Sequence, residues 1–143
     1  MTNSVKYSVV IPTYNSAFFI ADTVNQIGVE LNKTGAPFEI VIIDDSSIDN
    51  TWNEIKRLKA ETNYNIQGAR LSRNFGQHRS TLCGFEKAKG ELIITMDDDL
   101  ESNPKKIRDL LNKQSATDSD VVYAHYTNIR RGIIRTFMFW VYR

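Results

Sequence analysis

Four carboxylates near the middle of the chain have the residue types and spacing to bind a metal ion. Asp97, Asp98 and Asp99 come directly after the apolar run 92–96, and Glu101 follows two residues after Asp99. Acids this close repel one another and raise each other's pKa unless a cation neutralises them. Hard divalent ions such as Mg²⁺ and Mn²⁺ prefer oxygen ligands and share their coordination shell with phosphates. The run therefore predicts a divalent metal site, and a solvated acidic loop is the alternative.

The elements that must position these acids follow from the pattern of apolar residues. Short β-branched runs alternate with segments whose apolar residues recur every three or four positions, which is typical of an α/β fold with a mostly parallel sheet flanked by helices. Pro12 is expected to end the first strand, Ser16 to cap the first helix, and the tail from Arg130 onwards to be helical. The expected strands are 7–11, 38–43, 66–71, 92–96 and 120–123, and the expected helices are 17–33, one from about 51, 77–89 and one from 104.

Polar side chains follow each of the first four predicted strands. In a parallel α/β sheet, ligands bind beyond the carboxyl ends of the strands, so these residues would gather on one edge. Four strand ends that all carry such residues favour a functional site over a solvated loop. The residues concerned are Thr13 and Tyr14, Asp44 and Asp45, Arg73 and Asn74, and Asp97 and Asp99.

Composition and absent motifs restrict what this edge can bind. A net charge of +1 gives no basis for general nucleic-acid binding. The chain has no Gly-x-Gly-x-x-Gly, no Gly-x-x-x-x-Gly-Lys-Ser/Thr and no Gly-x-Ser-x-Gly motif. Phosphate would then be held by a metal on carboxylates, aided by Arg73 or Arg79. Tyr14 can stack on a base, and Asp44 or Asp45 can accept hydrogen bonds from a base or ribose. Together these features describe a nucleotide diphosphate site built without glycines.

Several segments carry a resemblance to a known family. Residues 9–15 (Val-Val-Ile-Pro-Thr-Tyr-Asn), 42–51 (Ile-Ile-Asp-Asp-Ser-Ser-Ile-Asp-Asn-Thr) and the Asp triplet 97–99 resemble the GT-A-fold glycosyltransferases of family 2. Residues 71–78 (Leu-Ser-Arg-Asn-Phe-Gly-Gln-His) and 90–104 are similar to the polyprenyl-phosphate branch. That branch includes dolichyl-phosphate mannose synthases and undecaprenyl-phosphate glycosyltransferases. The resemblance covers nearly the whole chain.

The resemblance implies roles for the matching positions. Asp97 and Asp99 match the Asp-x-Asp motif, which is catalytic and holds Mg²⁺ or Mn²⁺ with the diphosphate. Glu101, the third implied metal ligand, stands where many members of the branch carry Gln, and it adds a negative charge. Asp98 stands where the branch usually has Ala, a difference that the sequence does not explain. The residues expected to bind the nucleotide sugar are Pro12, Thr13, Tyr14, Asp44, Asp45, Arg73, Asp97 and Asp98.

The implied reaction is inverting transfer of a sugar from a UDP- or GDP-linked donor. A polyprenyl phosphate acceptor is already anionic and needs no general base. Residues 121–143 contain no Asp or Glu, so Arg130, Arg131 and Arg135 are candidates to bind the acceptor phosphate at a membrane surface. A core helix covered by further chain is the structural alternative. Two other functions remain open, namely transfer to a saccharide hydroxyl, which needs a base, and a nucleotide-binding fragment without activity of its own.

The resemblance also bears on domain organisation and location. Members of the family usually continue well past this length, so residues 1–143 are expected to be the nucleotide-sugar-binding part of a longer enzyme, truncated at the C-terminus. No run of 18 apolar residues occurs. The expected location is the cytoplasm, at the inner face of the cell membrane through the missing C-terminal region.

Overall fold

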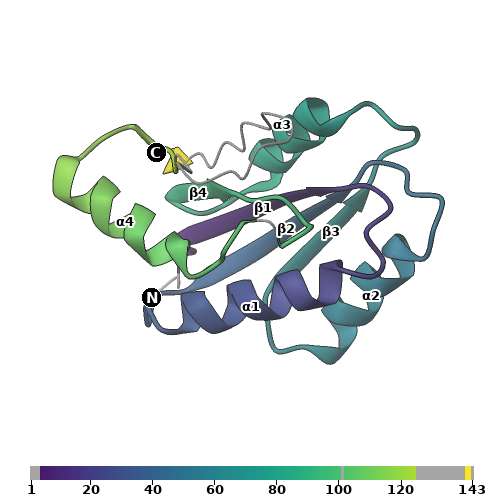
Figure 1. Ribbon diagram of the computed structural model, residues 1–143, viewed down its shortest axis with the longest axis horizontal. Coiled ribbons are helices and arrows are strands. Elements are labelled where there is room, and N and C mark those ends of the chain that lie inside the picture. Colours follow the sequence, from purple (N-terminus) through teal and green to yellow (C-terminus); the bar gives the residue numbers. More distant parts are fainter. Residues whose placement is uncertain (1–3, 101, 125–140, 143) are drawn as a thin grey trace, which may run out of the picture.

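A single twisted sheet with helices on both faces forms the protein (Figure 1). The computed structural model describes residues 4–100, 102–124 and 141–142. The elements in chain order are β1 (Tyr7–Thr13), α1 (Ile20–Asn32), β2 (Phe38–Asp44), α2 (Thr51–Glu61), β3 (Ile66–Arg70), α3 (Gln77–Lys87), β4 (Leu92–Thr95), α4 (Lys106–Thr117), β5 (Val121–Val122) and β6 (Val141–Tyr142).

The sheet has the strand order β3-β2-β1-β4-β6-β5, and its first four strands are parallel. β6 pairs antiparallel with both β4 and β5. Consecutive parallel strands require helical crossovers, and α1, α2 and α3 supply them. The predicted α/β architecture with a mostly parallel sheet is confirmed. Its consequence for function is that the carboxyl ends of β1, β2, β3 and β4 all lie at one edge.

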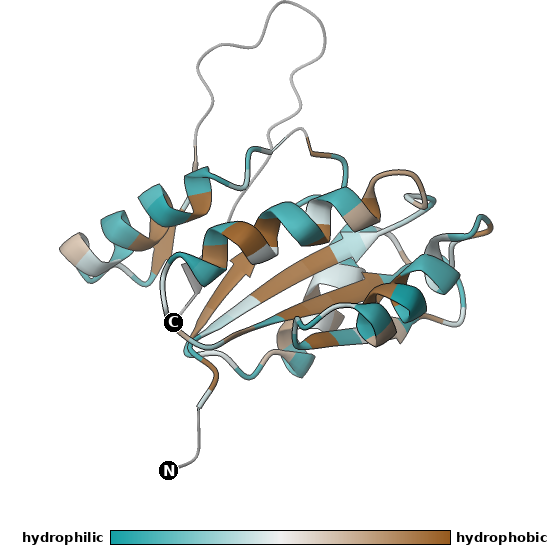
Figure 2. Ribbon diagram, turned by 90° about the horizontal axis from the view of Figure 1, so that it is seen from below, coloured by the Kyte–Doolittle hydropathy of each residue, from teal (hydrophilic) through white to brown (hydrophobic). Residues whose placement is uncertain are grey.

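Alternate residues of the central strands enter two separate cores. Val9 and Ile40 lie on the face covered by α1, α2 and α4, whereas Val10 and Val41 lie on the face covered by α3. All four side chains have no exposed surface. Figure 2 shows the result as apolar strands beneath helices whose outer surfaces are hydrophilic. Because both faces of the central strands are buried, their sequences read as continuous apolar runs rather than alternating ones.

A buried carboxylate fixes the opposite, amino-terminal end of the sheet. Glu39, near the start of β2, is fully buried. It accepts hydrogen bonds from the Ser8 hydroxyl, the Lys89 backbone N–H and the Gln67 side-chain amide, each at 2.6 Å. These contacts connect three strands and the turn between α3 and β4. A buried charge with three donors is a satisfied one, so Glu39 has a structural role away from the predicted site.

Apart from small shifts at the ends of other elements, three differences from the expected elements have a structural reason or limit what can be compared. Pro12 lies inside β1 rather than ending it. The backbone groups of Val10 face β4, and those of Pro12, two residues later, face the same way, but the pairing with β4 ends at Thr95. The nitrogen of Pro12 therefore needs no partner in a neighbouring strand. α1 begins at Ile20 after an irregular turn, and Ser16 does not cap it. Of the tail that was expected to be helical, residues 130–140 and 143 lie outside the described residues, and Val141–Tyr142 forms a strand on the edge of β4.

Among the residues that the structure describes, no helix combines the length and the hydropathy that crossing a bilayer requires.

Candidate active site

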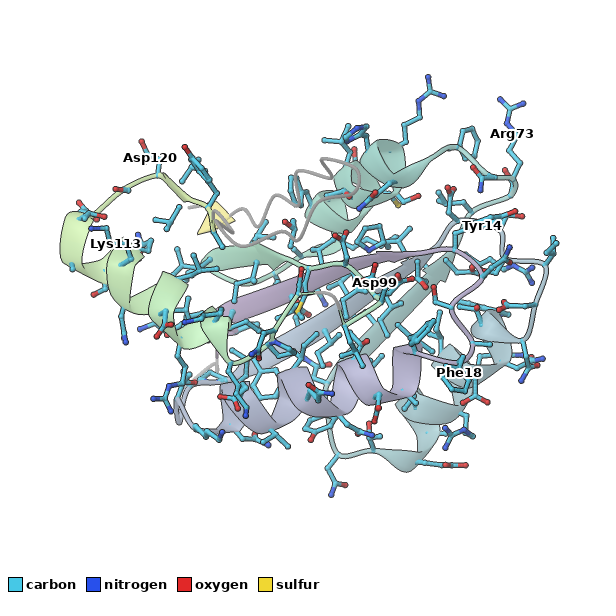
Figure 3. All side chains as sticks on the ribbon, viewed as in Figure 1. Tyr14, Phe18, Arg73, Asp99, Lys113 and Asp120 are labelled. Carbon is cyan, nitrogen blue, oxygen red and sulfur yellow. The ribbon has the colours of Figure 1, made fainter. Side chains whose placement is uncertain are left out.

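The loops after β1, β2, β3 and β4 come together at the carboxyl edge of the sheet, as the parallel topology requires. Figure 3 shows Tyr14 and Arg73 at this end of the molecule, with Lys113 and Asp120 at the far end. Asp99 lies between them, near the end of β4. The edge therefore brings together the acids and the aromatic residue that the sequence places at separate strand ends.

Asp44 and Asp45, which end β2, are both buried, with 0% and 3% of their surface exposed. The Asp44 carboxylate accepts a hydrogen bond from the Ser47 N–H at 3.0 Å and forms an ion pair with Arg70 Nε at 3.1 Å. Arg70 also donates from Nη2 to the Ser47 carbonyl oxygen at 2.7 Å. Asp44 thus holds the end of β2 to the end of β3 and shapes the turn that follows it.

Asp45 fixes the loop between β3 and α3. Its two carboxylate oxygens accept hydrogen bonds from the backbone N–H groups of Phe75 and Gly76, both at 2.8 Å. Gly76 has a φ of +90°, a conformation that L side chains rarely adopt, so glycine suits the point where α3 begins. The carboxylate therefore determines where α3 starts relative to the acidic run.

The loop after β1 and the loop after β2 are connected into one unit. The Asn15 N–H donates to Ser47 Oγ at 2.9 Å, and the Ile48 N–H donates to Asn15 Oδ1 at the same distance. Asn15 and Ser46 both have positive φ, 55° and 64°, and an Asn or a small polar residue tolerates that conformation. Tyr14, 45% exposed, projects from this unit at the edge of the sheet.

Asp97 and Asp98 turn to opposite sides of the sheet. Asp97 Oδ1 accepts a hydrogen bond at 2.5 Å from the side-chain amide of Gln77, at the start of α3. The Asp98 carboxylate instead accepts a hydrogen bond from the Ser16 hydroxyl, on the side of α1. This matches the expectation that neighbouring residues leaving a strand alternate between its faces. Leu100 then has a φ of +60°, which ends the extended backbone.

The environment of Asp98 holds the pKa of its carboxyl above the ordinary value of an aspartate. Partial burial raises the pKa of the Asp98 carboxyl; the hydrogen bond from the Ser16 hydroxyl opposes this rise, and the Asp99 charge adds to it. The backbone of Asp98 is also held, because its carbonyl oxygen accepts a hydrogen bond from the Thr23 hydroxyl at 2.9 Å. Asp98 is therefore held by its side chain through Ser16, in the loop before α1, and by its main chain through Thr23 in α1.

The remaining acids suit a divalent cation that shares its shell with a ligand. Within 4–100, 102–124 and 141–142, no three His, Cys, Asp or Glu side chains gather closely enough to hold a metal by themselves. Asp97 and Asp99 are partly buried at the sheet edge and offer two carboxylates. Mg²⁺ is commonly bound through one or two carboxylates, with waters and substrate phosphates completing the octahedron. The donor set therefore fits a metal that arrives with a diphosphate.

The other predicted site residues occupy varied positions. Pro12 and Thr13 are buried at the end of β1. Arg73 is exposed, points outward in Figure 3, and its guanidinium carbon lies 4.8 Å from the centroid of the Phe75 ring. The arginine that pairs with Asp44 is Arg70. Glu101, Arg130, Arg131 and Arg135 lie outside the described residues. The ligand-binding roles of all these residues stay predictions.

Sequence reasoning missed three residues that organise this edge, namely Arg70, Ser16 and Thr23. Arg70 lies directly opposite Asp44 in the parallel register of β2 and β3, a pairing that appears only once the strands are aligned. Ser16 was read as a helix cap, which is the usual role of serine before an apolar periodic segment. Its contact with Asp98 spans 82 positions in the chain, and no local pattern signals such a pair.

Comparison with curated proteins identifies relatives over the greater part of the chain. It is 39% identical over 106 residues to an undecaprenyl-phosphate 4-deoxy-4-formamido-L-arabinose transferase of Shewanella sediminis (strain HAW-EB3), covering 74% of this chain and 32% of that protein. The protein of the same description from Pseudomonas fluorescens (strain SBW25) is 34% identical over 115 residues, covering 80% and 33%. The chain thus spans about a third of the length of the curated relatives it matches.

Solved structures give the same picture of the fold. Residues 1–349 of S. aureus TarS in complex with UDP-GlcNAc superpose with a TM-score of 0.70 at 27% identity, covering 92% of this chain and 38% of that one. The mannosyltransferase PcManGT from Pyrobaculum calidifontis, solved in complex with GDP-Man and Mn²⁺, has a TM-score of 0.59 at 22% identity, covering 68% and 28%. The second likeness concerns the fold alone.

The family match extends over residues 8–139, which takes in every loop of the carboxyl edge described above. Its description is Glycosyl transferase family 2. With this match, and with strand ends that carry the acids and the aromatic residue of the resemblance, the chain belongs to Glycosyl transferase family 2.

Proposed function

We propose that this chain is the donor-binding part of an enzyme that transfers a sugar, with inversion, from a nucleotide diphosphate sugar to a polyprenyl phosphate. The observation that carries the proposal is the meeting of Asp97 and Asp99 with the Tyr14 and Asp44–Asp45 loops at one sheet edge. Support for the donor class comes from TarS, a structural neighbour solved with UDP-GlcNAc. Support for the acceptor comes from the curated relatives, whose names contain undecaprenyl phosphate.

Different residues of the edge bind the base, the ribose and the diphosphate of the donor. Tyr14 offers an exposed ring face for stacking on the base. Asp45 shapes the nucleoside pocket through the loop that it holds. Asp44 Oδ2 forms the ion pair with Arg70 but accepts no hydrogen bond from the described residues, so it retains lone pairs for a base N–H or a ribose hydroxyl. Asp97 and Asp99 hold Mg²⁺ or Mn²⁺ beside the diphosphate. When bound, the cation supplies Lewis-acid stabilisation of the negative charge that grows on the leaving group.

The chemical step exchanges one bond at the anomeric carbon for another. An oxygen of the acceptor phosphate attacks this carbon from the face opposite the diphosphate and forms a new C–O bond. The old C–O bond breaks, and the nucleoside diphosphate leaves with the electron pair, so the configuration inverts. A phosphate oxygen is already anionic near neutral pH, so no side chain has to remove a proton from the acceptor. Arg130, Arg131 and Arg135 are the proposed contacts for this phosphate, at the inner face of the membrane.

Calorimetric titration tests the donor site. UDP and GDP are each titrated into the chain with and without Mn²⁺, using wild type, Asp99→Asn and the control Asp109→Asn. Asp109 is an exposed carboxylate on α4, paired with Lys106 and far from the edge. We expect Mn²⁺ to tighten binding of one nucleotide by about tenfold or more in wild type and control, and to have little effect in Asp99→Asn. Equally weak heats under all conditions would overturn the proposal.

The acceptor is tested separately, with the full-length gene product. Transfer of labelled sugar to undecaprenyl phosphate in detergent micelles is compared with transfer to short oligosaccharides. Lipid-linked product is expected, with Asp99→Asn losing most of the activity. Product formed only on the oligosaccharide would refute the phosphate acceptor and would require a general base.

A further inference from the structure

Within the acidic run, the side chain of Asp98 is hydrogen-bonded to a different part of the protein from that of Asp97. Its carboxylate accepts a hydrogen bond from the Ser16 hydroxyl, and it faces α1 rather than α3, which Asp97 faces. A carboxylate held in this way is poorly placed to join Asp97 on one cation. We therefore look for a function of Asp98 other than direct binding of the metal ion.

Ser16 belongs to the segment that carries Tyr14. The Ser16 N–H donates to Thr51 Oγ1 at 2.8 Å, at the start of α2, so Ser16 is fixed to the second loop of the nucleoside side. Its neighbour Ala17 donates from its N–H to Asp49 Oδ2 at 3.2 Å. The Ser16–Asp98 hydrogen bond therefore joins the connected β1 and β2 loops to the end of β4.

The main chain of Asp98 is held by a residue near the start of α1. Thr23, fully buried, places its hydroxyl 2.9 Å from the Asp98 carbonyl oxygen. Two residues later Leu100 adopts a left-handed backbone, which a non-glycine residue keeps only where surrounding contacts hold it. Asp97 and Asp99 are the immediate neighbours of residue 98, so the direction of their side chains depends on how that residue is held.

We propose that the Ser16–Asp98 hydrogen bond is a positioning contact that couples the nucleoside loops to the metal-binding carboxylates, so that nucleotide and metal bind cooperatively. The inference rests on the proposed function of this edge and specifies how its two halves act together. A nucleotide that orders the Tyr14 loop also fixes Ser16, and through Asp98 it fixes Asp97 and Asp99. Because such coupling is reciprocal, bound metal tightens the nucleotide by the same factor.

The test measures two quantities for each variant: the ratio of UDP dissociation constants without and with saturating Mn²⁺, and binding of Mn²⁺ alone from the electron paramagnetic resonance signal of the free ion. GDP replaces UDP if wild type prefers it. The variants are Ser16→Ala, Asp98→Ala and Asp98→Asn, with Ser115→Ala and Asp109→Ala on α4 as matched controls. Urea unfolding confirms that each variant is folded.

We expect Ser16→Ala and Asp98→Ala each to lower the ratio by about tenfold, the factor that one hydrogen bond to a carboxylate is worth. UDP affinity without Mn²⁺ should change by less than about threefold, because the pocket itself is intact. Asp98→Asn should recover most of the ratio, because the amide oxygen still accepts the Ser16 hydrogen bond. The double variant Ser16→Ala/Asp98→Ala should lose no more than either single variant, since both remove the same contact.

Several outcomes overturn the inference while leaving the proposed function standing. One is wild-type cooperativity that persists in Ser16→Ala and Asp98→Ala. Another is an Asp98→Asn variant as defective as Asp98→Ala, which would assign Asp98 to direct binding through its charge. Additive losses in the double variant would also contradict a shared contact. Failure of wild type to bind nucleotide more tightly with Mn²⁺ would instead remove the proposed function itself.

Discussion

Replacing Asp45 with alanine should release the loop that leads into α3. The side chain is 3% exposed and accepts two backbone hydrogen bonds at 2.8 Å, from Phe75 and Gly76. Hydrogen bonds to charged groups contribute about 1.5–3 kcal/mol each. Two such bonds give about 3–6 kcal/mol, and water entering the vacated space restores part of this, so Asp45→Ala should lower the free energy of unfolding by about 3 kcal/mol.

Urea unfolding and amide hydrogen exchange measure this loss at two levels. With a urea dependence of about 1–3 kcal/mol per molar, the unfolding midpoint should fall by roughly 1–3 M. The amides of Phe75 and Gly76 should lose protection more than those of β1 and β2, because the lost bonds are their own. Asp45→Asn keeps one acceptor oxygen and should fall between wild type and Asp45→Ala.

Unchanged hydrogen exchange of the Phe75 and Gly76 amides in Asp45→Ala would refute the role of Asp45 in holding this loop. The matched control is Asp109→Ala, which removes an exposed carboxylate on α4 and should leave the free energy of unfolding within about 0.5 kcal/mol of wild type. A control as destabilised as Asp45→Ala would show that any lost aspartate, rather than the loop contact, produces the effect.

Three further substitutions test other parts of the account. Glu39→Ala removes the shared acceptor of three donors, one of them fully buried, and should cost about 3 kcal/mol or more, measured by urea unfolding. Gly84→Ala places a Cβ 2.3 Å from Val10 Cγ1, between α3 and the sheet, and should cost about 1–3 kcal/mol through overpacking, measured by thermal unfolding. At Asp49, burial disfavours the charge, but hydrogen bonds from Thr51 and neighbouring N–H groups outweigh it, so the pKa lies below its ordinary value. A carboxyl whose pKa is depressed in the folded state stabilises the protein at pH values above the ordinary aspartate pKa of about 4, and this contribution is lost as the pH falls through the folded-state pKa. Asp49→Asn should therefore flatten the acid arm of a stability–pH curve.

Each of these has a plain contrary result. Wild-type stability of Glu39→Ala would mean that water replaces the carboxylate without cost. An unchanged melting temperature for Gly84→Ala would mean that the helix shifts freely on the sheet. An acid arm that stays as steep in Asp49→Asn as in wild type would mean that other carboxylates carry the pH dependence.

The fold could be predicted because the signals that determine it are local. Apolar runs of β-branched residues in β1 and β2, separated by helical periodicity, require a buried parallel sheet. That topology in turn predicts that Asp44, Asp45 and Asp97 share an edge. The contacts with Gln77 and Ser16 place Asp97 and Asp98 on opposite faces, as the alternation of side chains along a strand requires.

The contacts within the edge could not be predicted in the same way. Asp45 was expected to bind a nucleoside, and the structure shows its oxygens occupied by the backbone of a loop 30 positions away. The excess carboxylate of Asp98 had no explanation in the sequence, because its partner Ser16 resembles an ordinary helix cap. Both are long-range hydrogen bonds, which depend on how loops approach one another in space rather than on the residues beside them.

A crystal structure of the chain grown with UDP and Mn²⁺ tests the central claim most directly. The account predicts an anomalous manganese peak between the carboxylates of Asp97 and Asp99, the diphosphate on its open side, and the base against the Tyr14 ring, with Asp98 still on Ser16. GDP is the second nucleotide if UDP is not bound. A manganese peak or nucleotide density at any other place on the molecule, with the carboxyl edge empty, would contradict the account.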